Sequence, residues 1–116
     1  MPISLIYHNP KCSKSRKALE ILENENIDLK VIKYLNGELT KEMLLEILKL
    51  SSLTIRDIIR KDDETYKINN LDNNRLSQDE LINYVVKFPK LLQRPIIVHN
   101  GTAIIARPPE KILEFI

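Results

Sequence analysis

Short apolar runs separated by polar turns open the chain and predict a strand, a helix and a second strand. Residues 3–7 (ISLIY) form an apolar run followed by a turn signal, as expected of a buried strand. Apolar residues then recur at helical spacing, among them Ala18 and Leu22. Residues 29–35 (LKVIKYL) favour a strand that ends at Asn36–Gly37. Because a helix is the usual connection between parallel strands, this first third predicts a βαβ unit.

The middle of the chain predicts helices, each preceded by a residue that can cap it. Thr40 precedes apolar positions at helical spacing, Thr54 is followed three residues later by an aspartate, and Ser77 is followed three residues later by a glutamate. Residues 62–75 (DDETYKINNLDNNR) are polar, and we make no prediction of their structure. We therefore expect a helical insert at about residues 40–90.

The last third returns to strands and ends in a helix. Residues 95–99 (PIIVH) and 102–105 (TAII) flank Asn100–Gly101, a dipeptide typical of a tight β-hairpin. Residues 107–110 (RPPE) then suit the first turn of a final helix. The predicted fold class is α/β, with a mixed sheet in the order β-α-β, helical insert, β-β-α, as one domain over residues 1–116.

Composition narrows the classes of partner. The net charge is only +2, and basic residues alternate with acidic ones, which argues against nucleic acid as the main partner. No apolar run approaches the ~18 residues of a membrane span, so no membrane partner is expected. The single cysteine can form no internal disulfide and leaves no cysteine pair for zinc, so we expect no metal site. A reducing, cytoplasmic location is the simplest prediction.

That cysteine, Cys12, falls where the first predicted strand ends and the first helix begins. Unpaired backbone N–H groups and the helix dipole favour a thiolate there, as does the charge of Lys11, Lys14 and Arg16. The hydroxyl of Ser15, like that of the neighbouring Ser13, can add a hydrogen bond to the sulfur. We therefore favour a reactive Cys12 over the alternative of a small buried apolar residue.

The two histidines are less specific. His8 closes the first strand, where it can orient the thiolate or donate to it, or be only a satisfied polar group, and both alternatives stay open. His99 lies beside the predicted hairpin turn, and we expect it to be exposed and without a role.

Arginine placement is the second signal. Arg94 and Arg107 each precede a proline, which restricts the backbone and would hold the guanidinium in a defined direction. Arg60 ends the TIRDIIR segment, where stabilising a helix C-terminus is a sufficient explanation. Each arginine taken singly is expected to be structural or solvated. Gathered around one thiolate, the three would form a pocket for a compact, multiply charged oxyanion.

Two spacings exclude other cysteine chemistries. A cysteine phosphatase needs an arginine six positions after its nucleophile, and here that position is Ala18. A dithiol oxidoreductase needs a second cysteine three positions on, and here that position is Ser15. Whatever Cys12 becomes in a redox cycle, an external reductant must restore it, and glutathione with a glutaredoxin is the natural candidate.

Taken together, these residues resemble the glutaredoxin-coupled arsenate reductase family, and in particular a shorter branch of it. The resemblance spans almost the whole chain and rests on residues 7–16 (YHNPKCSKSR), 58–61 (IIRK), 94–98 (RPIIV) and 101–110 (GTAIIARPPE). It implies a thioredoxin/glutaredoxin-like three-layer fold. It also implies a cis peptide bond before Pro95, which composition alone could not predict because only about 5% of X-Pro bonds are cis.

The resemblance also implies a site and a reaction. Cys12 would attack arsenate, with His8 supporting its ionised form. The residues that would bind the substrate are Arg60, Arg94, Arg107, Ser15 and Arg16. Glutathione would attack the Cys12–arsenate ester as a cosubstrate, and glutaredoxin would resolve the adduct and release arsenite. No bound cofactor is expected, and the protein would act as a monomer.

Two alternatives to arsenate reduction remain at this stage. The same cysteine could serve another glutathione-dependent thiol oxidoreductase, for which arsenate is incidental. The chain could also be a non-enzymatic binding or regulatory protein with a thioredoxin-like fold, since the fold family contains members that bind RNA polymerase. Ser15 in place of a second cysteine argues against a paired-cysteine redox switch, but not against a binding role.

Overall fold

The computed structural model describes residues 3–116, so residues 1–2 of the predicted domain lie outside the described part. Its strands are β1 (Ser4–Tyr7), β2 (Leu29–Ile32), β3 (Ile96–His99) and β4 (Thr102–Ile105). Its α-helices are α1 (Ser13–Asn24), α2 (Lys41–Leu50), α3 (Glu64–Ile68), α4 (Gln78–Lys87) and α5 (Ile112–Phe115). Short 3₁₀ turns, η1 (Tyr34–Asn36), η2 (Ile55–Ile58), η3 (Pro89–Leu91) and η4 (Pro109–Lys111), connect several of these elements.

The strands form a mixed sheet in the order β2-β1-β3-β4. β1 and β2 are parallel and are connected by α1, whereas β3 pairs antiparallel with both β1 and β4. The β3–β4 hairpin turns at Asn100 and Gly101, both with positive φ (49° and 77°), a conformation that asparagine and glycine tolerate best. The predicted βαβ unit and hairpin are therefore confirmed.

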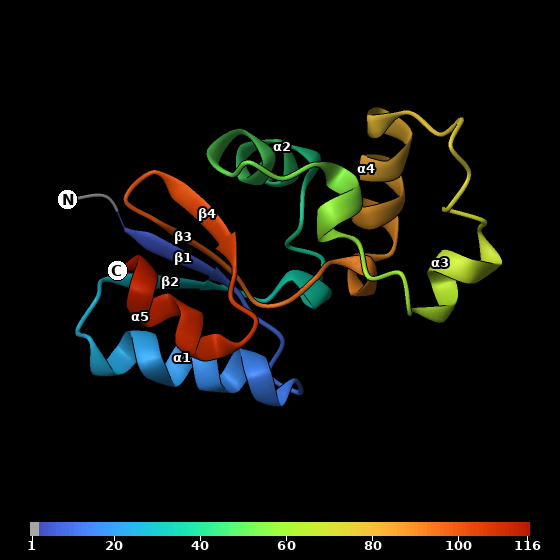
Figure 1. Ribbon diagram of the computed structural model, residues 1–116. Coiled ribbons are helices and arrows are strands. Elements are labelled where there is room, and N and C mark those ends of the chain that lie inside the picture. Colours follow the sequence, from blue (N-terminus) through green and yellow to red (C-terminus); the bar gives the residue numbers. More distant parts are fainter. Residues whose placement is uncertain (1–2) are drawn as a thin grey trace.

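Helices cover both faces of the sheet and give three layers (Figure 1). On one face, Ile6 and Ile97 pack with Ala18 and Leu22 of α1 and with Ile112 of α5. On the other face, a larger core joins the sheet to α2, α4 and the 3₁₀ turns. Because successive strand residues point to opposite faces, β1 and β3 each supply both cores.

The first and last α-helices of the insert, α2 and α4, begin at the predicted caps. Thr40 Oγ1 accepts the N–H of Met43 at 3.2 Å, and Ser77 forms a reciprocal capping box with Glu80 at the start of α4. The polar segment 62–75, for which no structure was predicted, contains the short helix α3.

Two predicted elements are shorter than expected. The strand predicted over residues 29–35 ends at Ile32, because β1 turns away after His8, whose N–H donates to the Ile32 carbonyl at 2.9 Å. Residues 34–36 form η1 instead. The helix predicted after Thr54 is the single turn η2, which ends at Ile58, so Arg60 caps no helix.

Two further sequence-based expectations concern single residues. The Arg94–Pro95 peptide bond is cis, as predicted, and so is Arg107–Pro108. The prediction that His99 is exposed is wrong, because His99 is partly buried: its Nδ1 lies 2.6 Å from Ser4 Oγ, and its ring meets Phe115 edge-on. No helix within residues 3–116 is long and apolar enough to cross a membrane.

Candidate active site

The loop between β1 and α1 places Cys12 at the N-cap of α1. The N–H of Cys12 donates to the Asn9 carbonyl at 3.0 Å, which closes a turn. The Asn9 side chain supports the same turn, since its Oδ1 accepts the N–H of Lys11 at 3.0 Å. The Cys12 thiol is thereby held half-buried over the first turn of the helix.

Ser15 joins this loop to the end of β1. It is fully buried, its Oγ accepts the N–H of Asn9 at 3.0 Å, and it shares a 2.7 Å hydrogen bond with Nδ1 of His8. The sequence suggested a hydrogen bond from this hydroxyl to the sulfur. In the structure the hydroxyl is directed at His8 and Asn9 instead. The backbone N–H of Ser15 makes the contact with Cys12 instead.

The environment of Cys12 favours its thiolate. Burial raises the pKa of the thiol, but the backbone N–H groups of Ser15 and Lys14, together with the neighbouring Arg94 guanidinium, outweigh it, so the net pKa is below the ordinary cysteine value. Helix N-termini and guanidinium groups both stabilise a negative sulfur. The prediction of an activated cysteine therefore has a physical basis here.

His8 is a buried neutral side chain. Burial, followed by the positive charges of Lys33 and Arg16, lowers its pKa below the usual histidine value. A neutral imidazole brings no positive charge to the thiolate. In the described residues His8 is hydrogen-bonded to Ser15 and not to Cys12. Its place in the site is therefore to position the loop through Ser15, and a direct role in catalysis stays a prediction.

Backbone pairing on both sides of Arg94 gathers the three predicted arginines from distant parts of the sequence. The N–H of Arg60 donates to the Leu91 carbonyl at 2.7 Å, in an antiparallel bridge that follows η2. The N–H of Ala106 donates to the Pro95 carbonyl at 2.9 Å. These contacts bring residues 60 and 107 next to Arg94.

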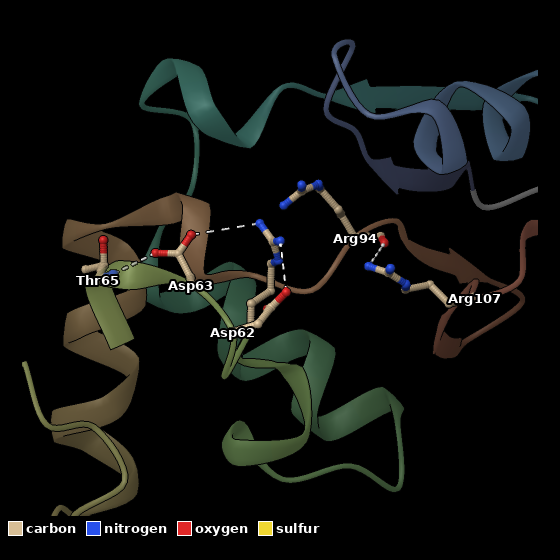
Figure 2. Close-up of polar contacts among 6 residues, drawn as sticks. Asp62, Asp63, Thr65, Arg94 and Arg107 are labelled. Carbon is tan, nitrogen blue, oxygen red and sulfur yellow. Dashed lines mark hydrogen bonds and ion pairs between the residues drawn. The ribbon is translucent and has the colours of Figure 1, made fainter. Parts of the chain in front are cut away.

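The three guanidinium groups nevertheless have different partners. Arg94 is the one that interacts with Cys12. Arg60 forms ion pairs with Asp62 and Asp63 at 3.6 and 3.9 Å, and Arg107, which is exposed, donates to the Arg94 carbonyl at 3.4 Å. Figure 2 shows the Arg107 guanidinium directed at the Arg94 backbone while the Arg94 side chain extends in another direction.

A cavity of about 630 Å³ adjoins this cluster. Arg60, Lys61 and Arg107 are among its lining residues, together with Gln93 and Asp62. Its size falls in the range of small-molecule sites, and its walls offer more basic than acidic groups. A small anionic molecule would suit it.

Arg16, predicted to bind substrate, instead holds the loop in this structure. Its guanidinium donates to the Pro10 carbonyl at 2.9 Å, on the exposed side of α1. Its positive charge acts on His8. A substrate-binding role for Arg16 stays a prediction.

Sequence reasoning missed Tyr34. It was placed in a predicted strand among apolar residues, where it would be an ordinary core residue. In the structure η1 turns it inward until it is fully buried, and its hydroxyl interacts with Arg94 and Cys12. The available signal was a phenol among apolar residues at a strand end, because a buried Tyr hydroxyl needs a partner.

Cys12 and Arg94 together can perform one kind of chemistry. A nucleophilic sulfur lies beside a fixed cation and two backbone donors, which can hold a small tetrahedral anion for attack. Among residues 3–116 no group of His, Cys, Asp and Glu side chains is arranged to hold a metal ion.

Comparison with known proteins agrees with this arrangement. The model of the ArsC family matches residues 7–115. An arsenate reductase of Neisseria meningitidis serogroup B is 42% identical over 113 residues, which cover 97% of this chain and 97% of that protein. An arsenate reductase of Escherichia coli is 33% identical over 111 residues, which cover 96% of this chain and 79% of that protein. A solved structure described as an arsenate reductase from Vibrio cholerae matches with a TM-score of 0.92 and 45% identity, covering 97% of each chain. The predicted thioredoxin-like α/β fold is confirmed.

Proposed function

The chain belongs to the ArsC family, and we propose that it reduces arsenate to arsenite with Cys12 as the nucleophile. The observation that carries the proposal is the Cys12 thiol, whose pKa is lowered beside Arg94 at the start of α1. A thiolate is the reactive form, and an adjacent fixed cation stabilises both an incoming oxyanion and the charge that develops on it.

In the first step the Cys12 sulfur forms a bond to arsenic and one arsenic–oxygen bond breaks. The departing oxygen leaves as water after it takes up protons from solvent. Arsenic stays pentavalent in this thioester. Arg94 and the N–H groups of Lys14 and Ser15 surround the sulfur, so they hold the charge of the oxyanion as the new bond forms.

The next steps need thiols from outside the chain, because the sequence contains one cysteine. Glutathione displaces a second oxygen as water, which places its sulfur on arsenic. The cavity beside Arg60 and Arg107 suits this cosubstrate, since basic side chains line it and glutathione carries two carboxylates.

A glutaredoxin thiolate then attacks the glutathione sulfur. The sulfur–arsenic bond breaks, its electron pair reduces arsenic to the trivalent state, and a glutaredoxin–glutathione disulfide forms. Water releases arsenite from Cys12 and restores the thiol. One arsenate and two thiols thus give one arsenite, one disulfide and one water.

The location and assembly follow from the same chemistry. Cys12 must be a free thiol at the start of each cycle, and glutathione must be supplied in its reduced form, both of which the cytoplasm favours. Cys12, Arg60, Arg94 and Arg107 come from one copy of the chain, so we propose that it acts as a monomer.

A coupled assay tests the proposal. Arsenate-dependent oxidation of NADPH is measured with glutathione, glutathione reductase and glutaredoxin, and a parallel reaction replaces these with thioredoxin and its reductase. We expect turnover with the glutathione system and none with Cys12→Ser. Equal rates for wild type and Cys12→Ser would exclude arsenate reduction by Cys12. Turnover with the thioredoxin system alone would show that thioredoxin, and not glutathione with glutaredoxin, is the reductant. Rapid deglutathionylation of a protein substrate without arsenate turnover would favour another thiol oxidoreductase.

A further inference from the structure

Two buried hydrogen-bond donors beside Cys12 have no partner. The side chain of Tyr34 is 0% exposed, and its hydroxyl makes no hydrogen bond within residues 3–116. The same is true of the buried Nε of Arg94. Buried polar groups are almost always hydrogen-bonded. Two buried donors without a partner at one place therefore indicate that an acceptor binds there.

The fold brings these two donors together from separate elements. Tyr34 begins η1, directly after β2, and Arg94 precedes β3, while β1 lies between these strands and leads to the Cys12 loop. The Arg94 guanidinium and the Cys12 sulfur both act on the pKa of the Tyr34 phenol, so both lie near it, although neither makes a hydrogen bond of good geometry with its hydroxyl. All three groups therefore adjoin one point at the carboxyl ends of β1 and β2.

The chemistry of these groups limits what can satisfy them. An Arg guanidinium has only donors, so it cannot accept the proton of the Tyr34 hydroxyl. Burial, with Arg94 opposing it and Cys12 adding to it, raises the pKa of Tyr34 to about 12, so the phenol keeps its proton and remains a donor. The missing partner must be an acceptor, and beside a cation it is best an anion.

We propose that the Tyr34 hydroxyl and the Arg94 Nε–H together hold an oxygen of the tetrahedral oxyanion at Cys12, which makes Tyr34 a catalytic residue of the reduction. The inference rests on the proposed function for the identity of the oxyanion. Tyr34 fixes the oxygen that stays on arsenic, while the sulfur bonds to arsenic and another oxygen leaves as water. The proton of Tyr34 is not transferred.

A simpler role for the hydroxyl is a hydrogen bond to the resting thiolate. That bond would change the pH at which Cys12 reacts, but it would not change the affinity for an oxyanion. The two roles therefore separate in a measurement that records thiol reactivity and anion binding independently.

Tyr7 offers a matched control. It is buried in the same core, at 2% exposure, and burial and the charge of Glu46 also raise its pKa to about 12. Neither Cys12 nor Arg94 contributes to that shift. Tyr7→Phe and Tyr34→Phe thus remove the same atom from comparable surroundings, and only one of them removes it from the site.

The experiment follows alkylation of Cys12 by iodoacetamide, across pH and with increasing sulfate or arsenate in the absence of glutathione. We expect each anion to protect wild type and Tyr7→Phe at the same concentration. Tyr34→Phe should need about 10-fold more anion for half-protection, the effect of one lost hydrogen bond to a charged group. In the coupled assay its kcat/KM for arsenate should fall by about 100-fold, the usual loss of one oxyanion donor.

Each contrary result has a defined meaning. Equal half-protection in wild type and Tyr34→Phe, or a wild type that no anion protects, would overturn the role of Tyr34. If Tyr34→Phe shifted the pH profile of alkylation but left the half-protecting concentration of anion unchanged, the oxyanion role would also be overturned, and a hydrogen bond from Tyr34 to the resting thiolate would replace it. Protection that depends on Tyr34 in a protein without arsenate turnover would support the anion site and reject the proposed function, so the two failures are distinguishable.

Discussion

The Oγ of Ser15 lies 2.7 Å from Nδ1 of His8 and connects the first turn of α1 to the end of β1. The same oxygen accepts the N–H of Asn9. Ser15 therefore supports the Cys12 loop through two groups, the Nδ1 of His8 and the backbone N–H of Asn9. The serine and the histidine act on the thiol by fixing the backbone donors that point at it.

Replacing Ser15 by alanine should lower both the stability of the fold and the reactivity of the Cys12 thiol. The change leaves the N–H of Asn9 and the ring of His8 without a partner in a buried place, which should lower the free energy of unfolding by about 1–3 kcal/mol. The loosened loop should also slow alkylation of Cys12 at neutral pH. Urea unfolding and iodoacetamide kinetics measure the two effects. Ser13→Ala, at an exposed position of the same turn, should change neither.

Stability should fall on mild acidification because of His8. Its pKa is lowered in the folded protein, so between that value and the ordinary value of about 6.5 the unfolded chain holds a proton that the folded protein does not. Unfolding then takes up a proton, and the free energy of unfolding decreases as the pH falls. Urea unfolding at about pH 7.5, 6.5 and 5.5 should show this slope.

His8→Asn provides the control for that slope. Asparagine can still hydrogen-bond to Ser15 but does not titrate, so the variant should lose much of the pH dependence over the same range. His99 is present in both proteins and cancels in the comparison. Identical slopes would mean that folding does not shift the pKa of His8.

Features that depend on neighbouring residues could be predicted from the sequence. Cys12 at the start of α1 followed from an apolar run, a turn and helical spacing in one short stretch. The Asn100–Gly101 hairpin and the Ser77 cap follow from turn and capping chemistry, which is local. The cis bond before Pro95 needed the resemblance to a family, since no local signal distinguishes it.

Features that depend on distant contacts could not be predicted. The position of Arg60 beside Arg94 is set by the antiparallel bridge between Ile59 and Leu92. No sequence pattern around either residue predicts that pairing. The ion pairs of Arg60 with Asp62 and Asp63 are local in the sequence, but both aspartates lie in the polar segment for which no structure was predicted. Tyr34 was predicted to lie in a strand because residues 29–35 favour one, and its place beside Arg94 could not be predicted because the two residues meet only in the folded chain.

Arg94→Ala should affect the thiol and the substrate together. The guanidinium lowers the pKa of Cys12, so its removal should move the pH profile of alkylation to higher pH. It should also weaken the transition state for arsenate by ~2–3 kcal/mol, the usual scale of one preorganised electrostatic contact. Arg94→Lys restores the charge without the Nε donor, and it should recover the pH profile but not the full kcat/KM. An unshifted pH profile of alkylation in Arg94→Ala would show that Arg94 does not lower the pKa of Cys12.

Asp62→Asn should make the Arg60 guanidinium more available. Asp62 is 78% exposed, and its ion pair with Arg60 is long at 3.6 Å, so the free energy of unfolding should change by less than about 1 kcal/mol. The KM for arsenate should fall by about twofold at low ionic strength, and the difference should vanish in high salt, where exposed charges are screened. Asp72→Asn, an exposed aspartate outside the cavity lining, is the matched control. A KM equal to that of Asp72→Asn at low salt would show that Arg60 does not attract the oxyanion.

Arg107→Ala should separate substrate binding from thiol activation. Arg107 is exposed on the cavity wall and is not among the groups that lower the pKa of Cys12, so the pH profile of alkylation should stay as in wild type. The value of kcat/KM should still fall, by up to ~2–3 kcal/mol of transition-state stabilisation, if Arg107 holds the oxyanion or its adducts. Initial rates with arsenate and glutathione varied in turn show which KM rises. A rise for glutathione alone would assign Arg107 to the cosubstrate in the cavity, a rise for arsenate would assign it to the oxyanion, and unchanged kinetics would remove it from the site. Since Arg94 and Arg107 lie on one stretch of paired backbone, contrasting profiles in the two variants would show that position relative to Cys12 decides what each arginine does.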